Sequence, residues 1–478
     1  MAQHSATPVS SSAPAALDRR LILLAVTTLI GGFASMLDAT IVSVAVPALS
    51  HSLYAPLSTL QWVVTGYLLA MMAVIPVTGW AVERYGARRV WLFALVIFLG
   101  GSVLSGAAWS VGSLIGFRLL QGVGGGMILP VAQTIVVQAA GPERIGRIMS
   151  LIAVPAQLAP ICGPVIGGLL VDGLSWRWMF YVNVPICLAA IVMSLVLIPA
   201  GGPAPHHKLD LLGLMLLSPG LAALVYGLSL SADHGFTHPL VISWLAAGLA
   251  LLCGYAVHAL RPKVTAIIDL RLFRSRAFST ASTVMFLYGV SIFAAMFLLP
   301  LYYVQARGAS ALYAGLLLAP QGLGTLLALT IVGKFTDRVG PRPIILIGLA
   351  IATVGTLPFV FFAHDGNMIL LGAALLVRGM GLGAAIVPAN AAAYQGLPDR
   401  SVPRATSAVN IVQRIGQAFG TAVLALVLES QLVAHNSTAT GMASAFSNTF
   451  LWTLILTGAA LVPALLIPGH RATNRTPA

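Results

Sequence analysis

Charged side chains are scarce in this sequence, and carboxylates are the scarcest of them. Only 8% of the 478 residues are charged and only 12 are Asp or Glu, whereas 58% are hydrophobic. Soluble domains carry about 25% charged residues, so the composition excludes a soluble globular protein. Because the apolar runs are of helix length, the sequence predicts an all-α polytopic membrane protein.

Cysteine is nearly absent, and its three occurrences, Cys162, Cys187 and Cys253, all fall inside apolar runs. None belongs to a CxxC motif or has a histidine at ligand spacing, so neither a disulfide framework nor a metal site is predicted. The sequence also has no HExxH, GxSxG or P-loop motif. These absences argue against an enzyme, against a bound cofactor and against direct use of ATP.

The formal net charge of +13 does not indicate a nucleic-acid partner. The basic residues lie in short clusters between apolar runs and form no recognised nucleic-acid motif. Their placement instead follows the rule that cytoplasmic loops of membrane proteins are enriched in Lys and Arg.

Apolar runs bounded by charge, proline or glycine predict fourteen membrane-spanning helices. Their centres lie near Ile30, Met71, Ile97, Gly126, Pro160, Ala190, Gly220, Leu249, Ile292, Gly322, Ala352, Leu382, Ala418 and Leu456. Twenty of the 25 basic residues lie in the two tails and in every second loop, whereas the opposite loops hold only Arg177 and Arg307. Both termini are therefore predicted to be cytoplasmic, in a multi-pass protein of the cell membrane.

The chain also contains an internal repeat. Residues 79–89 have the sequence GWAVERYGARR, and residues 333–343, which begin 254 positions later, have the sequence GKFTDRVGPRP. A weaker echo relates QGVG at residues 121–124 to RGMG at residues 378–381. Parallel repeats of this kind are a transporter architecture.

Two six-helix halves account for twelve of the fourteen spans and leave a central pair near Gly220 and Leu249. The chain is therefore divided by prediction into five parts. They are a disordered cytoplasmic tail over residues 1–20, a first half over 21–200, two linking helices over 201–260, a second half over 261–468 and a cytoplasmic tail over 469–478.

One carboxylate, Asp38, lies deep inside the first apolar run, which extends from Leu21 to Pro47. A spanning helix needs roughly 20 apolar residues, so this side chain falls within the hydrocarbon. Ionisable groups there are costly and usually mark a route for substrate or protons. The alternative is a structural aspartate that hydrogen-bonds a neighbouring helix. Glu429 is the remaining carboxylate candidate, near the outer end of its span.

Several other polar groups lie inside the spans. Asn410, Gln413, Arg414 and Gln417 recur at helical spacing on one span, and this stripe is expected to line a cavity or another helix rather than lipid. The other candidates for a substrate cavity are polar or adaptable side chains deep in their spans: Met127, Gln133, Gln157, Tyr288, Gln321 and Asn390.

Five motifs give the chain a recognisable pattern. They are LDATIVSVAVP (37–47), GWAVERYGARR (79–89), RLLQGVGGG (118–126), PAQLAPICGPVIGG (155–168) and WRWMFYVNVP (176–185). In these motifs the chain resembles the fourteen-helix drug/proton antiporter branch of the major facilitator superfamily. The resemblance implies the major facilitator fold, with two six-helix halves and two extra central helices. It also implies proton-coupled efflux of hydrophobic or cationic drugs, and hence drug or antibiotic resistance.

The resemblance assigns roles to particular residues. Arg118 is expected to modulate a proton site, for which burial favours Asp38 and leaves Glu429 as the second candidate. The residues expected to gate the pathway are Glu83, Arg84, Arg88, Asp337, Arg338, Gly163, Pro164, Gly167 and Gly168. Family members usually have aspartate at the position of Glu83, so this chain departs from the pattern by one methylene.

Two alternatives remain open. A proton-coupled transporter of a small metabolite would use the same two halves. A membrane enzyme or a receptor belongs to another class: the missing catalytic motifs argue against an enzyme, and a receptor has no use for the doubled architecture. The predicted partners are a small-molecule substrate, protons and the lipid bilayer, while the compound itself and a periplasmic or outer-membrane partner protein are not determined by the sequence.

Overall fold

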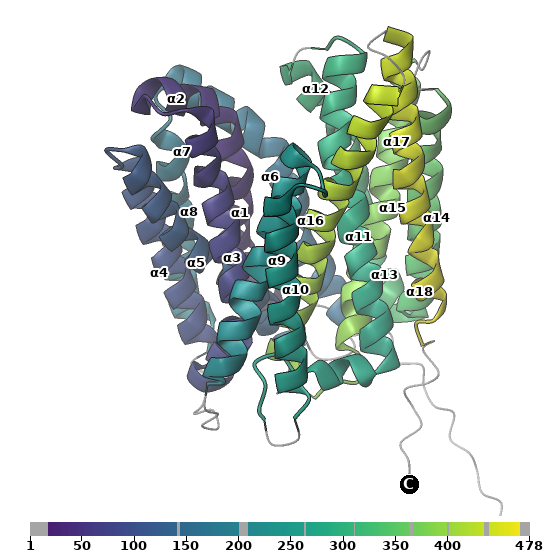
Figure 1. Ribbon diagram of the computed structural model, residues 1–478. Coiled ribbons are helices and arrows are strands. Elements are labelled where there is room, and N and C mark those ends of the chain that lie inside the picture. The colour runs from purple at the N-terminus through teal and green to yellow at the C-terminus, as the bar shows by residue number, and fades with distance from the viewer. Residues whose placement is uncertain are drawn as a thin grey trace, which may run out of the picture.

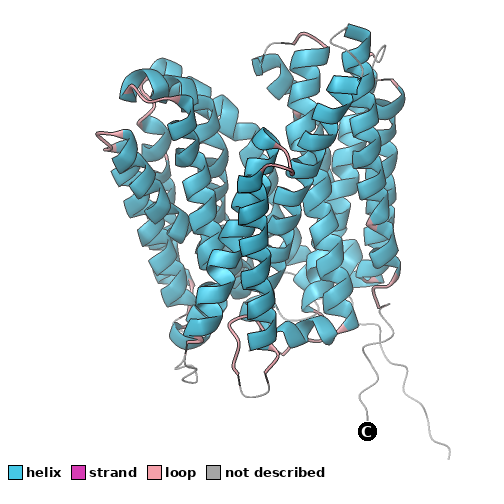
Figure 2. Ribbon diagram, viewed as in Figure 1, coloured by secondary structure: helices cyan, strands magenta, loops and turns pink. Residues whose placement is uncertain are grey.

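The computed structural model describes residues 18–140, 144–199, 209–261, 264–309, 311–362, 367–398, 401–434 and 439–468. Nearly all of these residues are helical, and no strand occurs among them (Figure 2). Thirteen described helices are long and apolar enough to cross a membrane. A further helix, α6 (Ile145–Gly173), occupies the place of the fifth predicted span. All fourteen predicted centres therefore fall on helices.

The long helices form two groups of six with a pair between them. The first half contains α1 (Arg19–Ile41), α3 (Leu57–Tyr85), α4 (Ala87–Gly106), α5 (Val111–Ala140), α6 and α8 (Asn183–Leu197). The central pair is α9 (Leu211–His234) and α10 (Pro239–Ala259). The second half contains α11 (Arg276–Leu301), α13 (Ala319–Val339), α14 (Pro341–Phe361), α15 (Met368–Tyr394), α16 (Val402–Ala434) and α17 (Ala439–Ala459).

Short elements connect the long helices. They are η1 (Val42–Ala45), α2 (Val46–Leu53), α7 (Trp178–Tyr181), η3 (Leu270–Arg274), the π-helical η4 (Tyr302–Ala306), α12 (Ala311–Leu317) and α18 (Leu461–Leu465). The predicted run Leu21–Pro47 is thus not one continuous α-helix, because α1 ends at Ile41 and η1 follows. Pro47 lacks a backbone donor and lies at the start of α2, where that loss is tolerated.

The two halves stand side by side and meet mainly along two helix pairs (Figure 1). Helix α3 packs against α16, and α6 packs against α13. The central pair lies against this seam, where α9 contacts both α3 and α16. We call the end at which α1 and α16 begin the basic end. The halves come together there and diverge toward the opposite end, which carries α2 and α12 (Figure 1).

The repeated motif has the same local structure in both halves. Gly86 ends α3 with a φ of 84°, and Gly340 ends α13 with a φ of 89°. Side chains rarely adopt this left-handed region, so glycine is favoured at both positions. In each half the next helix begins at the following residue, which makes the motif a sharp turn at the basic end.

The predicted tails lie mostly outside the described residues. Residues 1–17 and 469–478 are not among them. Helix α1 begins at Arg19, inside the predicted 1–20 tail, because the Asp18 side chain accepts a hydrogen bond from the backbone nitrogen of Arg20 and caps the helix.

Candidate functional site

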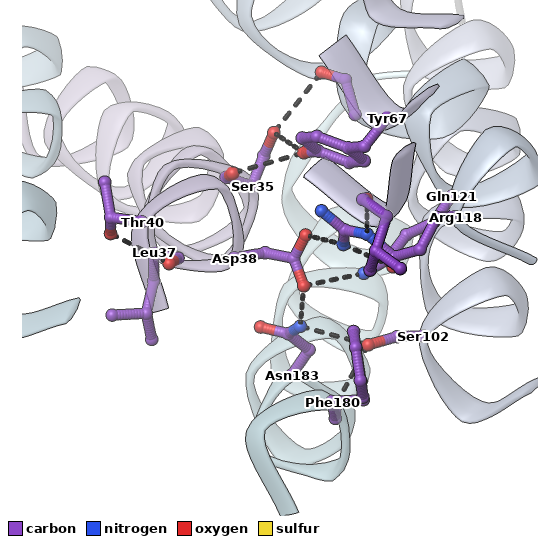
Figure 3. Close-up of polar contacts among 12 residues, drawn as sticks. Ser35, Leu37, Asp38, Thr40, Tyr67, Ser102, Arg118, Gln121, Phe180 and Asn183 are labelled. Carbon is purple, nitrogen blue, oxygen red and sulfur yellow. Dashed lines mark hydrogen bonds and ion pairs between the residues drawn. The ribbon is translucent and has the colours of Figure 1, made fainter. Parts of the chain in front are cut away.

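Asp38 lies in a polar cluster inside the first half, with no solvent exposure (Figure 3). Its Oδ2 accepts from Nη1 of Arg118 at 2.5 Å. Its Oδ1 accepts from Nε2 of Gln121 at 2.8 Å and from Nδ2 of Asn183 at 3.0 Å. An ionised carboxylate has only acceptor sites, so three donors from α5 and α8 match it. The structure therefore brings Asp38 and Arg118 together as one buried ion pair.

Arg118 is as buried as its partner and is held on several sides. Its Nε donates to the carbonyl of Val63 at 3.1 Å, and Nη1 also donates to Oε1 of Gln121 at 2.8 Å. The guanidinium carbon lies 4.0 Å from the centroid of the Tyr67 ring, within the range of a cation–π contact. A charge that cannot deprotonate is thus compensated by a carboxylate, a carbonyl and an aromatic ring.

A second layer of hydrogen bonds orients this cluster. The Tyr67 hydroxyl donates to the carbonyl of Ser35 at 3.3 Å, and Nδ2 of Asn183 also donates to Oγ of Ser102 at 3.0 Å. Ser102 in turn donates to the carbonyl of Phe180 at 2.8 Å. The Oδ1 atom of Asn183 is buried without a hydrogen-bond partner among the described residues.

Glu429 does not belong to the cluster. It is exposed, and it lies near the end of α16 that is remote from the basic end. Of the three predicted proton-coupling residues, the structure therefore brings two together and separates the third.

The second half has a related cluster around Arg378 on α15. Its Nη1 donates to Oε1 of Gln321 at 2.7 Å, and its Nη2 donates to the carbonyl of Ser291 at 2.9 Å and to that residue's Oγ at 3.3 Å. Arg378 is as buried as Arg118. No described carboxylate pairs with it, so its charge is solvated by neutral oxygens alone.

Some of the other predicted cavity residues are packed inside one half, and others lie at the interface between the halves. Asn410 of α16 donates to Oε1 of Gln133 of α5 at 2.7 Å, and both are buried. Asn390 donates to the carbonyl of Ile386 within its own helix. Met127 and Tyr288 are buried in the apolar core. Gln413, Arg414 and Gln417 remain partly exposed, and the Gln157 side chain lies outside the described part of the chain.

Two ion pairs join the halves at the basic end. Glu83 of α3 accepts from Nη2 of Arg404 of α16 at 2.7 Å. Asp337 of α13 lies 3.2 Å from Nε of Arg147 of α6 and accepts from the backbone nitrogen of Gly146 at 2.9 Å. In each case the acid of the repeated motif, on the second long helix of one half, pairs with an arginine at the start of the fifth long helix of the other half.

The first glycine of the motif lets these helices approach each other. A Cβ on Gly79 would lie 3.0 Å from the carbonyl oxygen of Pro403, and a Cβ on Gly333 would lie 2.9 Å from that of Gly146. The motif thus supplies a close contact, a charge and a turn in both halves. We call the four charged residues of the two ion pairs, Glu83, Arg404, Asp337 and Arg147, the basic-end gate.

The arginines predicted to act beside the motif acids lie elsewhere. Arg88 donates to the carbonyl of Leu195 in its own half at 2.7 Å. Arg84 lies 5.7 Å from the ring of Tyr85, and Arg338 is exposed. The sequence analysis did not identify Arg147 and Arg404 as partners. A signal was present, because both stand in an R-x-x-S segment, at residues 147–150 and 404–407.

The glycine and proline motif of α6 packs against the helix that carries Asp38. A Cβ on Gly163 would collide with the Thr40 side chain of α1, and Oγ1 of Thr40 donates to the carbonyl of Ala159 at 3.2 Å. Gly167 is buried, whereas a Cβ on Gly168 would meet open space. The Pro164 side chain lies outside the described residues.

A cavity of about 1080 Å³ lies at the basic end. Its lining includes Arg20, Arg88 and Arg144 together with Glu83 and Arg404 of the basic-end gate. Asp38 and Arg118 do not line it. The cavity is therefore separate from the buried cluster.

Comparisons with known proteins identify the family of this chain. The family profile of the Major Facilitator Superfamily matches residues 28–421. The chain is 36% identical over 425 residues to a "Multidrug resistance protein B homolog" of Mycobacterium tuberculosis, which covers 88% of this chain and 78% of the relative.

Solved structures share the fold at low sequence identity. The human organic anion transporter MFSD10 has a TM-score of 0.65 at 16% identity and covers 92% of this chain and 100% of its own. The proton:xylose symporter XylE has a TM-score of 0.61 at 15% identity, with coverages of 94% and 96%. With the family profile, the multidrug resistance relative and the shared fold taken together, this multi-pass membrane protein belongs to the Major Facilitator Superfamily and to its drug-transporter branch.

Proposed function

We propose that this drug-efflux transporter exports hydrophobic compounds across the cytoplasmic membrane in exchange for protons, with both termini in the cytoplasm. The observation that carries the proton part is the buried ion pair of Asp38 with Arg118. A carboxylate without solvent exposure inside a spanning helix is costly unless it is paired, and such groups mark proton routes in transporters.

Proton binding to Asp38 removes the negative charge toward which Arg118, Gln121 and Asn183 donate. The ion pair then loses its attraction, and the three helices α1, α5 and α8 must repack around an uncompensated arginine. A change in α1 reaches α6 directly through the contact of Thr40 with Gly163. Since α6 also carries Arg147 of the basic-end gate, α6 links the helix of the proposed proton site to the gate.

The basic-end gate closes the halves on the side that the distribution of Lys and Arg assigns to the cytoplasm. In the described state both ion pairs are formed and the halves diverge at the opposite end (Figure 1). Opening toward the cytoplasm requires both pairs to break, as in a rigid-body exchange of access between two halves.

The test uses purified protein in sealed proteoliposomes loaded with a fluorescent hydrophobic drug. Export driven by an imposed pH gradient requires a proton site, whereas exchange of labelled for unlabelled drug at equal pH does not. We expect Asp38→Asn, which keeps the shape and removes the charge, to lose gradient-driven export and to retain exchange. Asp38→Glu is expected to keep part of both.

Glu429→Gln provides the matched control, because Glu429 is an exposed carboxylate remote from the cluster. It is expected to export as the wild type does. Undiminished gradient-driven export by Asp38→Asn would show that Asp38 is a structural hydrogen-bonding residue. Uptake of the drug with protons, in place of exchange against them, would favour a proton-coupled importer.

A further inference from the structure

The membrane-spanning interior described by the structure carries more positive than negative charge. Its buried or partly buried ionised groups are Arg118, Arg378 and Arg414 on one side and Asp38 on the other. Asp38 is paired with Arg118. No described carboxylate pairs with Arg378 or Arg414, so two cations inside the bundle are left without an acid.

Arg378 contributes charge to this region but is not available to a ligand. It is fully buried, and Gln321 and Ser291 occupy its donors. Its positive charge still acts over distance, because the low dielectric of a protein interior screens it weakly.

Arg414 is the available cation. It is partly exposed and makes no hydrogen bond or ion pair with a described residue. It lies one helical turn beyond Asn410, whose side chain crosses to Gln133 of the first half, so the two side chains share a face of α16. Arg414 also lies within electrostatic range of Tyr67 of α3. Both observations direct Arg414 toward the interface of the halves and away from lipid.

Tyr67 connects this arginine to the proton site. Its ring lies 4.0 Å from the guanidinium carbon of Arg118, and its hydroxyl is engaged with Ser35. A compound bound beside Arg414 would therefore lie next to the cluster that holds Asp38. The partly exposed amides of Gln413 and Gln417 flank Arg414 on the same helix.

We infer that the compounds exported are hydrophobic anions, carrying a carboxylate, sulfonate or phenolate, and that Arg414 binds the charged group. The inference rests on the proposed function and names its substrate class. A cationic compound would meet two uncompensated arginines and a carboxylate already paired with Arg118, whereas an anion gains a charge-assisted hydrogen bond from a free guanidinium. The family resemblance instead predicts hydrophobic or cationic compounds.

The charge of the substrate also decides how the membrane potential acts. One proton entering while one monovalent anion leaves moves two positive charges inward, so an inside-negative potential drives export. Exchange of one proton for one monovalent cation moves no net charge, so the membrane potential does not drive it. Potential dependence is thus a second readout that does not require a variant.

The binding test compares two dyes that share a xanthene ring system, anionic fluorescein and a cationic rhodamine ester, by fluorescence anisotropy on the purified full-length protein. We expect wild type to bind fluorescein more tightly. Loss of a hydrogen bond from a charged group is expected to weaken fluorescein binding by Arg414→Gln about tenfold or more. Rhodamine binding is expected to stay equal or to tighten.

Two further variants and a control sharpen the test. Arg414→Lys keeps the charge and is expected to keep the preference for the anion, whereas Arg414→Glu is expected to reverse it. Arg274→Gln removes an exposed cation at the basic end and is expected to change neither affinity.

The outcomes separate the inference from the proposed function. Equal wild-type affinity for the two dyes, an unchanged affinity ratio in Arg414→Gln, or export of fluorescein that ignores an imposed potential would overturn the anion preference alone. Absence of pH-gradient-driven export of both fluorescein and the rhodamine ester by wild type would instead overturn the proposed function, whatever the dyes' binding ratio.

Discussion

Each half of the molecule buries an arginine on its fourth long helix but surrounds it differently. In the first half Arg118 of α5 pairs with Asp38 of α1, and in the second half Arg378 of α15 contacts Ser291 of α11. Each arginine lies on the fourth long helix of its half and reaches the first long helix. The arginine of the first half contacts an acid and that of the second half contacts a serine, which concentrates the proposed proton chemistry in the first half.

At the basic-end gate, in contrast, the two halves contribute matching residues. The ion pairs of Glu83 with Arg404 and of Asp337 with Arg147 follow the internal repeat on both sides of the interface. A gate between two halves must act on both of them at once, whereas one proton site is enough for coupling. The acidic residues of the repeat are therefore kept where the halves meet, whereas the buried arginines inside the halves have different partners.

The largest expected difference between the halves concerns their arginines. Arg118→Gln leaves Asp38 buried without its partner, which costs about 3–5 kcal/mol in comparable buried pairs. We expect it to abolish gradient-driven export and to lower the melting temperature in detergent, with Arg118→Lys restoring export only in part. Arg378→Gln removes a cation that has no described carboxylate partner, and it is expected to change the melting temperature little. Equal damage from both would remove the distinction between the halves.

The gate gives the next largest effect. Replacing a charged hydrogen-bonding group costs about 1.5–3 kcal/mol, less at exposed positions. Asp337 has two partners and a side chain 4% exposed, against 12% for Glu83. We therefore expect Asp337→Ala to impair export more than Glu83→Ala.

The measurement for the gate is alkylation of a cysteine introduced at Ala405, a buried position beside Arg404. Labelling from the basic end is expected to accelerate in both gate variants. Arg338→Gln is the control, because that arginine is exposed and outside both ion pairs. An unchanged labelling rate with both acids replaced would exclude a gating role for them.

A smaller effect is expected from giving the second half the acid that it lacks. Ser291→Asp places a carboxylate beside Arg378, whose Nη2 lies 3.3 Å from the serine hydroxyl. The new pair compensates one buried cation, so fluorescein binding is expected to weaken by about threefold through loss of positive potential. Gradient-driven export should still depend on Asp38. Export that survives Asp38→Asn in this background would mean that either half can carry the proton.

The smallest predicted effect comes from Asn183→Ala. This change removes one of three donors to Asp38 and is expected to cost about 1 kcal/mol. Export should continue at a reduced rate, with its pH dependence displaced from that of the wild type. An unaltered pH profile would show that Arg118 and Gln121 suffice to orient the carboxylate.

Much of this architecture was predictable from the sequence because it depends on single segments. Each of the fourteen spans is an apolar run long enough to form a helix. The repeat at residues 79–89 and 333–343 is recognisable from the similarity of the two amino-acid sequences. That Asp38 and Arg118 need partners inside the protein followed from their type and position, since ionisable groups within hydrocarbon are costly when unpaired.

The identity of those partners was not predictable in the same way. Hydropathy does not say which face of a helix meets lipid, a neighbour or the other half. It therefore grouped exposed Glu429 with buried Asp38, and it assigned Met127 and Tyr288 to a cavity although both are buried in the core.

The sequence by itself determined that this protein spans the membrane as a doubled bundle of helices with a few charges inside it, because helix length and apolar composition are local properties. Only the tertiary structure decided how those charges are matched. Asp38 meets Arg118 across 80 residues and Glu83 meets Arg404 across 321, while Arg378 and Arg414 meet no acid among the described residues. Charge compensation depends on distances between helices, and these are decided by how the helices pack.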